Sequence, residues 1–147
     1  ETVKSVVDDF NNIYKVKRGI NISYKNDGKN KYLIYGIENR IEQIIANLLD
    51  NAISFSDDDK DVIVQVSKSE DNKVYIKILD EGQGFKEKDT NKIFKRFYSN
   101  RPDKFGQHSG LGLNIVKNLV DLHNATIKAT NRQDKKGASM EIEFPKV

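Results

Sequence analysis

The sequence predicts a two-layer α/β sandwich, in which a mixed sheet of about five strands packs on three helices. Apolar residues recur at helical spacing in three segments, around residues 3–17, 38–56 and 110–123. Between and after these segments, apolar and polar residues alternate with the period of a strand. The two kinds of segment do not alternate strictly along the chain, and this mixed order points to the sandwich.

The first half of the chain contains two predicted helices. Residues 3–17 form an amphipathic pattern that ends near a glycine, a common helix terminus. Residues 20–25 alternate as a strand, and residues 32–35 predict a short second strand. The strongest helical pattern runs from about Glu38 to Ser56. Its apolar stripe comprises Ile41, Ile44, Ile45, Leu48, Ala52 and Phe55.

The second half contains a predicted hairpin and the last helix. Alternating residues around 62–66 and 74–78 flank a polar turn at residues 70–72, which predicts a β-hairpin. Two final strands are expected at about 126–131 and 138–144, after the helix at residues 110–123.

Between the hairpin and the last helix lies a segment with little periodicity. Residues 90–97 predict a short helix. Residues 98–109 contain Pro102, Gly106 and several charges, so they predict a flexible loop. Because this loop has few apolar anchors, we expect it to be poorly ordered without a ligand.

Composition narrows the possible functions. With 147 residues and 37% hydrophobic residues, the chain fits one globular domain. It has no cysteine, which excludes disulfides and thiolate sites. His108 and His123 are too far apart in sequence to suggest a His-rich metal site, and no apolar run approaches the roughly 18 residues that cross a bilayer. The chain starts inside a helical pattern without a methionine, so we expect it to be part of a longer protein.

The positive charge is concentrated in one segment. The net charge is +3, and residues 86–104 contain seven Lys or Arg against three acidic residues, an excess of +4. Nucleic-acid binding would predict a wider basic face with interleaved aromatic residues. A short cationic loop is better suited to a small polyanion such as a nucleoside triphosphate.

Two asparagines on the predicted helix at residues 38–56 are the first candidate ligands. Asn47 and Asn51 are four residues apart, so they lie about 40° apart on a helix and project from one face. An amide oxygen is a hard, neutral ligand suited to Mg²⁺, which takes much of its shell from water and phosphate. On its own, such a pair is more often a solvated asparagine face.

Two glycine clusters supply the other candidates. Asp80 ends a predicted strand and opens a loop with Gly82 and Gly84, where its carboxylate could accept a hydrogen bond from an exocyclic amine such as that of adenine. An ordinary strand-end turn would also use these residue types. The second cluster precedes the last helix, whose free N–H groups attract phosphate, although tight helix packing explains the glycines as well. Its residues are Ser109, Gly110, Leu111, Gly112 and Leu113.

Cations in the poorly periodic segment are possible phosphate ligands. Arg96 follows Phe94 and Lys95 in an aromatic cluster, where it could face phosphate at the base of the loop. Arg101 could act from the loop itself, whereas Lys104 is better explained as a solvated charge.

Together these residues resemble the catalytic, ATP-binding domain of bacterial sensor histidine kinases, a family within the gyrase, Hsp90 and histidine kinase ATPase superfamily. The resemblance covers nearly the whole chain and rests on four motifs in the family's order. They are Asn47 to Ala52 (the N box), Asp80 to Phe85 (the G1 box), Ile93 to Tyr98 (the F box), and Gly110 to Leu113 with Ile115 to Lys117 (the G2 box).

The resemblance implies a Bergerat-type ATP-binding fold and a role for each motif. Asn51 would coordinate Mg²⁺, with Asn47 beside it near the phosphates and the reacting group. Asp80 would bind the adenine amine, and Gly82 and Gly84 would line the base pocket. The second glycine cluster, residues 109–113, would admit the triphosphate. Arg96 would act in transfer, and residues 98–109, including Arg101, would form a lid over the nucleotide.

The resemblance also implies a place in a larger protein. Residues 1–18 would be a linker helix and the start of the catalytic domain, which would occupy residues 19–147. ATP and Mg²⁺ would be the cofactors, and the γ-phosphate would go to a histidine on a separate dimerisation domain. A response regulator would be the next partner, with no role for nucleic acid. The whole protein would be a membrane-anchored homodimer of the inner membrane, with this domain in the cytoplasm.

Three positions depart from the family's pattern. Ser54 lies where many members carry a Lys that contacts phosphate, and Ser99 lies where many carry Arg or Lys. Either Arg96, Arg101 or Lys104 replaces these cations in function, or the affinity for nucleotide is low. Asn124 and Ala125 replace a common Gly-Gly pair, and Asn124 is expected to adopt the left-handed conformation that asparagine tolerates.

Neither histidine has the context of the family's phosphoacceptor, so we expect a histidine kinase fragment that is not active on its own. His123 is expected to be structural and His108 to belong to the lid. Two alternatives remain: a serine-directed kinase or ATPase of the same superfamily, and a non-catalytic or weakly binding nucleotide or docking module. Asn47 argues against hydrolysis because an amide is not a general base, whereas Ser54 and Ser99 favour weak binding.

Overall fold

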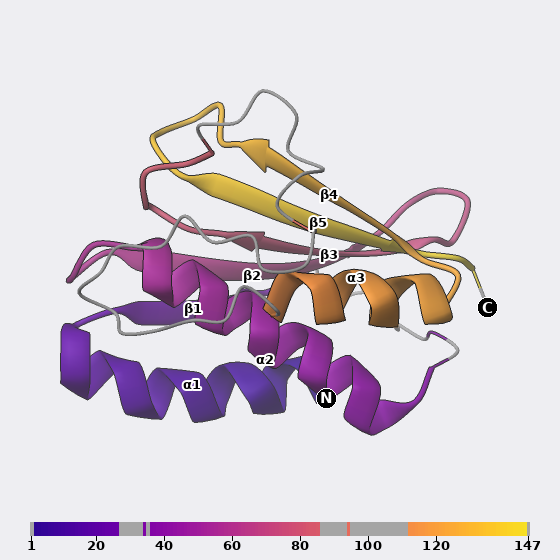
Figure 1. The fold of residues 1–147 in the computed structure, drawn as a ribbon, viewed down its shortest axis with the longest axis horizontal. Coiled ribbons are helices and arrows are strands. Elements are labelled where there is room, and N and C mark those ends of the chain that lie inside the picture. Colours follow the sequence, from indigo (N-terminus) through magenta and orange to yellow (C-terminus); the bar gives the residue numbers. More distant parts are fainter. Residues whose placement is uncertain (1, 27–33, 35, 86–93, 95–111, 147) are drawn as a thin grey trace.

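The computed structural model describes residues 2–26, 34, 36–85, 94 and 112–146. Within this part of the chain, three helices lie on one side of a single five-stranded sheet (Figure 1). The helices are α1 (Thr2–Arg18), α2 (Glu38–Phe55) and α3 (Gly112–Leu122). The strands are β1 (Asn21–Lys25), β2 (Asp61–Lys68), β3 (Val74–Leu79), β4 (Thr126–Asn131) and β5 (Ala138–Phe144). This architecture confirms the predicted two-layer sandwich.

The sheet has the order β1-β2-β3-β5-β4. Strand β1 runs parallel to β2, and all other neighbours are antiparallel, so the sheet is mixed as predicted. The β2–β3 hairpin turns at Asn72, which has a φ of +65°, a conformation that asparagine adopts more readily than most residues. In the centre, β3 pairs with β5, which brings Leu79 opposite Ser139 at the end where the candidate site residues follow.

The core lies between the sheet and the helices. Alternate residues of the central strands face it, including Val64, Ile76 and Ile142, which are all buried. Helix α2 supplies the largest helical share, because its apolar stripe recurs every three or four residues. Its buried hydrophobic residues are Ile41, Ile44, Ile45, Leu48, Leu49, Ala52 and Ile53.

The other face of the sheet is polar and is tied by cross-strand pairs. The Tyr75 hydroxyl donates to Glu143 Oε1 at 2.7 Å, and Lys77 Nζ lies 3.5 Å from Glu141 Oε2. Such pairs stabilise neighbouring strands by a few tenths of a kcal/mol each, up to about 1 kcal/mol. None of the helices in the described part of the chain is long and apolar enough to cross a membrane.

Most predicted element boundaries agree with the structure to within two residues. The final strands match the predicted ranges, and α2 ends one residue earlier than expected. Three predictions fall largely outside the described residues: the strand at 32–35, the short helix at 90–97 and the loop at 98–109. The last helix was expected from residue 110, and its described part begins at Gly112.

Candidate functional site

Helix α2 carries both candidate asparagines and places them differently. Asn47 is half-buried, and its Nδ2 donates a long hydrogen bond of 3.5 Å to the carbonyl oxygen of Gly112, the first residue of α3. Asn51, one turn further along, is only 4% exposed. The alternative of a solvated asparagine face is therefore ruled out at Asn51. Instead, the pair lies along the side of α2 that approaches the start of α3.

The loop after β3 packs against the other end of α2. Gly82 forms an isolated antiparallel bridge with Ser56, and a Cβ on Gly82 would lie 2.2 Å from the carbonyl oxygen of Phe55. Only a glycine permits this approach of the loop to the helix terminus. Because Asn47, Asn51 and Phe55 are spaced by four residues, Asn51 lies one turn from each contact. Helix α2 thus joins both glycine clusters across about 12 Å of its length.

Asp80 follows β3 as a buried carboxylate, with 3% of its surface exposed. Its Oδ1 accepts hydrogen bonds from the backbone N–H groups of Gly82, at 2.9 Å, and Ala138, at 3.0 Å. Burial raises the pKa of this carboxyl above its usual range, and the two N–H donors and the nearby Arg132 oppose that rise. Within the described residues, both hydrogen bonds to this carboxylate are made to Oδ1 and none is made to Oδ2.

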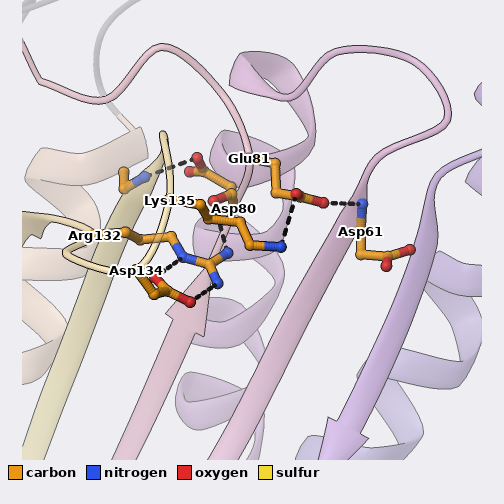
Figure 2. Close-up of polar contacts among 7 residues, drawn as sticks. Asp61, Asp80, Glu81, Arg132, Asp134 and Lys135 are labelled. Carbon is orange, nitrogen blue, oxygen red and sulfur yellow. Dashed lines mark hydrogen bonds and ion pairs between the residues drawn. The ribbon is translucent and has the colours of Figure 1, made fainter.

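The turn between β4 and β5 contacts the backbone carbonyl of Asp80. The sequence pattern did not identify this turn as part of the site. Arg132 Nη1 donates to the carbonyl oxygen of Asp80 at 3.1 Å, as Figure 2 shows. Gly137 has a φ of +147°, and a Cβ at this position would lie 2.0 Å from the same carbonyl oxygen. Gly137 is thus required both by its conformation and by its contact with Asp80. The only available sequence signal was a Lys/Asp/Gly turn between two strands.

A chain of polar contacts continues outward from Asp80 (Figure 2). Lys135 Nζ lies 3.2 Å from Glu81 Oε1, and Glu81 Oε2 accepts from the backbone N–H of Asp61 at 2.9 Å. That N–H donor and Lys135 lower the pKa of Glu81. These contacts connect the loop after β3 to the start of β2 on one side and to the β4–β5 turn on the other.

Gly84, in the loop after β3, lies beside Asn131, the last residue of β4. The Asn131 side chain brackets the residue after Gly84: its Oδ1 accepts from the Phe85 N–H at 2.6 Å, and its Nδ2 donates to the Phe85 carbonyl at 3.2 Å. Asn131 therefore continues the pairing of the sheet into the loop. It is a further supporting residue that the sequence pattern did not reveal.

Only part of the second cluster lies within the described residues. Gly112 begins α3 with no described atom within 4 Å of a Cβ built on it. Leu113, a predicted site residue, is half-buried and packs against the core. The remaining predicted site residues lie outside the described residues, namely Arg96, Arg101, Ser109, Gly110 and Leu111.

Two departures from the expected pattern can be placed. Ser54 is buried, and its Oγ donates to the Asp50 carbonyl one turn back at 2.8 Å. Asn124 has a φ of +57°, which confirms the predicted left-handed conformation. His123 is buried with both ring nitrogens in contact with backbone, which confirms its structural role. Ser99 lies outside the described residues.

Comparison with known proteins agrees with this arrangement. Residues 36–147 match the family model described as histidine kinase-, DNA gyrase B-, and HSP90-like ATPase. The sensor protein ChvG of Agrobacterium fabrum is 35% identical over 142 residues, which cover 92% of this chain and 24% of that protein. The sensor protein KdpD of Clostridium acetobutylicum is 38% identical over 108 residues, which cover 72% of this chain and 12% of that protein. The chain thus spans a quarter or less of the length of these relatives.

Solved structures show the same fold. The catalytic domain of histidine kinase ThkA, in a nucleotide-free form, superposes with a TM-score of 0.83 at 25% sequence identity. The superposition covers 99% of this chain and 90% of that domain. The family match spans more than half of the chain, and the four motifs predicted the same relationship. This chain belongs to the histidine kinase-, DNA gyrase B- and HSP90-like ATPase family and is of the catalytic-domain type found in sensor histidine kinases.

Proposed function

We propose that this chain binds ATP with Mg²⁺ and donates the γ-phosphate to a histidine on a separate dimerisation domain. The observation that carries the proposal is the position of α2 between the two glycine clusters. Asn47 contacts Gly112 at the start of α3, and Phe55 packs on Gly82 in the loop after Asp80. A nucleotide whose base meets Asp80 and whose phosphates meet the start of α3 would lie along this helix.

Asp80 is suited to base recognition. Its Oδ1 is held by two backbone donors, so the carboxylate plane is fixed before a ligand arrives. A carboxylate oxygen accepts a hydrogen bond from an exocyclic amine and repels a carbonyl oxygen at the same place. Adenine presents an amine at its six-position and guanine a carbonyl, so we expect ATP to be preferred over GTP.

The asparagines fit a metal that arrives on the nucleotide. The described residues contain no group of three or more His, Cys, Asp or Glu side chains that could hold a metal ion. Amide oxygens are hard ligands, and Mg²⁺ completes its shell with water and phosphate oxygens. Asn51 and Asn47 would hold the ion, which when bound neutralises charge on the phosphates. We assign Arg96 and Arg101 to the phosphates on the basis of the motifs alone.

Asn47 distinguishes transfer from hydrolysis. Phosphoryl transfer depends mainly on positioning and on charge stabilisation, whereas hydrolysis benefits from a residue that orients or activates water. An amide cannot take a proton from water, so Asn47 favours transfer to another acceptor. The chain would need a dimerisation domain to act. A full-length histidine kinase of similar fold, ShkA, has been solved with AMPPNP, and ThkA has been solved with a response regulator.

The proposal extends to the whole protein. Residues 1–18 would link the dimerisation domain to a catalytic domain at residues 19–147. The intact protein would be a membrane-anchored homodimer with this domain in the cytoplasm, and it would pass phosphate to a response regulator. These assignments rest on the relatives, which are sensor proteins several times longer than this chain.

Isothermal titration of the 147-residue chain with ATP and with GTP, each with Mg²⁺, tests the proposal. We expect ATP to bind and GTP to bind at least about tenfold more weakly. Adding the dimerisation domain in trans should then produce acid-labile phosphate on that domain, and an Asp80→Asn variant should not support it. Absence of detectable ATP binding would refute the nucleotide site. Binding without transfer would favour the non-catalytic nucleotide module.

A further inference from the structure

The guanidinium of Arg132 is nearly inaccessible although it lies in a surface turn. Its side chain is 4% exposed, whereas that of its partner Asp134 is 64% exposed. Nε and Nη2 donate to the two carboxylate oxygens of Asp134 at 3.0 and 2.8 Å, which is the bidentate geometry that fixes an arginine. Nη1 is then directed to the Asp80 carbonyl oxygen at 3.1 Å (Figure 2).

Asp80 is held at both ends by the same turn. Its carbonyl accepts from Arg132 and contacts Gly137, and its carboxylate accepts from the N–H of Ala138. The Arg132 N–H donates to the Gly137 carbonyl at 2.9 Å and closes the turn. A rotation of the Asp80 peptide would break the Arg132 contact. The direction of the second carboxylate oxygen, Oδ2, therefore depends on Arg132.

We propose that Arg132, fixed by Asp134, is a positioning residue for Asp80 and sets the affinity of the site for an adenine base. The inference rests on the proposed ATP-binding function and deepens it. Arg132 makes its contact with the backbone carbonyl of Asp80 and not with its carboxylate. Its effect on the base is therefore transmitted through Asp80.

The positive charge of Arg132 also favours a ligand-binding Asp80, because it favours the ionised carboxylate. Arg132 lowers the pKa of Asp80, which burial raises. Among the described residues, Arg132 pairs with Asp134 and also interacts with the charge of Glu81, which itself pairs with Lys135. Removing Arg132 would therefore raise the pKa of Asp80 further, and the protonated form would prevail at a higher pH. A protonated carboxyl is a weaker acceptor for an amine.

Three variants separate this role from simple folding. Arg132→Met keeps the aliphatic stem and removes charge and donors, whereas Arg132→Lys keeps the charge but cannot make the forked contact. Lys135→Met is the matched control, since it removes a cation from the same turn that contacts Glu81 and not Asp80. Thermal melting establishes that each variant is folded. Isothermal titration with ATP and with inorganic tripolyphosphate, both with Mg²⁺, is then repeated from pH 5 to pH 8.

Arg132→Met should weaken ATP binding by about fivefold and leave tripolyphosphate binding unchanged. Its loss of ATP affinity on acidification should begin at a higher pH than in the wild type. Arg132→Lys should weaken ATP binding while keeping the wild-type pH profile, and Lys135→Met should alter neither. Equal losses for ATP and tripolyphosphate, or wild-type affinity and pH profile in Arg132→Met, would overturn the inference.

A measurement without nucleotide keeps the inference separate from the proposed function. The carboxyl carbon of Asp80 can be titrated by nuclear magnetic resonance in the ligand-free wild type and in Arg132→Met. We expect the Asp80 midpoint to lie higher in the variant than in the wild type. If the wild type fails to bind ATP, the proposed function fails. An unchanged Asp80 midpoint refutes the positioning role whether or not ATP binds.

Discussion

The imidazole of His123 joins the end of α3 to the residue that precedes α2. His123 Nδ1 lies 2.7 Å from the Leu119 carbonyl oxygen, and Nε2 accepts from the Ile37 N–H at 3.2 Å. This assigns the neutral tautomer with the proton on Nδ1. Ile37 has no side-chain cap of its own, so the imidazole satisfies one of the free donors at this helix start. The same two helices meet again at Asn47 and Gly112.

Replacing His123 with alanine should therefore loosen the helix pair that forms one wall of the candidate site. We expect His123→Ala to reduce the free energy of unfolding by about 1–3 kcal/mol, because the Ile37 N–H loses its acceptor and the Leu119 carbonyl keeps only the backbone N–H of residue 123. Urea unfolding followed by circular dichroism measures this change. Asp121→Asn is an exposed change at the same helix end that, within the described residues, affects an i,i+4 pair with Lys117, and it should stay within about 0.5 kcal/mol. Equal effects of the two variants would contradict the bridging role.

The buried charge of Asp80 should lower the free energy of unfolding at neutral pH, although the carboxylate is needed to bind the ligand. Its pKa is raised in the folded protein because burial disfavours the charged form. A folded-state pKa above the unfolded value means that the native state binds more protons, so stability decreases as pH rises through this range. Asp80→Asn keeps an oxygen for the two backbone donors and removes the buried charge.

We therefore expect Asp80→Asn to be at least as stable as the wild type at pH 7 and to lose ATP binding. The difference in melting temperature should shrink as pH falls and Asp80 becomes protonated in the wild type. Melting curves between pH 3 and pH 8, together with ATP titration at pH 7, measure both effects. A variant that is markedly less stable at neutral pH would show that the carboxylate charge itself supports the fold.

The motifs and most elements could be predicted from sequence because their signals are local. The stripe of α2 and the alternation in β3 and β5 report which face each residue buries, and burial then indicates how the two layers pack. Contacts across the sheet edge carry no such signal. Arg132 meets Asp80, 52 residues away, only because the β4–β5 turn folds back with Gly137 at positive φ. In sequence, Arg132 is one more charge in a polar turn.

Replacing Gly137 or Gly112 with alanine should change the free energy of unfolding in opposite directions. Gly137→Ala places a Cβ 2.0 Å from the Asp80 carbonyl in a conformation that disfavours side chains, so we expect a loss of about 2 kcal/mol or more in stability and weaker ATP binding. Gly112→Ala meets no described atom and lies at the start of a helix, where alanine is favoured by up to about 1 kcal/mol.

Gly112→Ala should therefore keep or raise the unfolding free energy and still weaken ATP binding, because a methyl group would stand where phosphate approaches the start of α3. Urea unfolding and ATP titration on both variants test the pair. If Gly112→Ala bound ATP like the wild type, the phosphates would not approach this glycine closely. A stable Gly137→Ala would show that the turn can move away from Asp80.

Asn47 offers a test of the metal-dependent part of the site that does not depend on folding. Its hydrogen bond to Gly112 is 3.5 Å long, at the limit of such contacts, so Asn47→Ala should change stability by less than about 0.5 kcal/mol. If its amide oxygen helps hold Mg²⁺ beside the phosphates, ATP affinity should fall about tenfold with Mg²⁺ and little in EDTA. Asn118→Ala, an exposed asparagine on α3, is the control. An equal loss with and without Mg²⁺ would place Asn47 against the nucleotide itself and remove it from the metal shell.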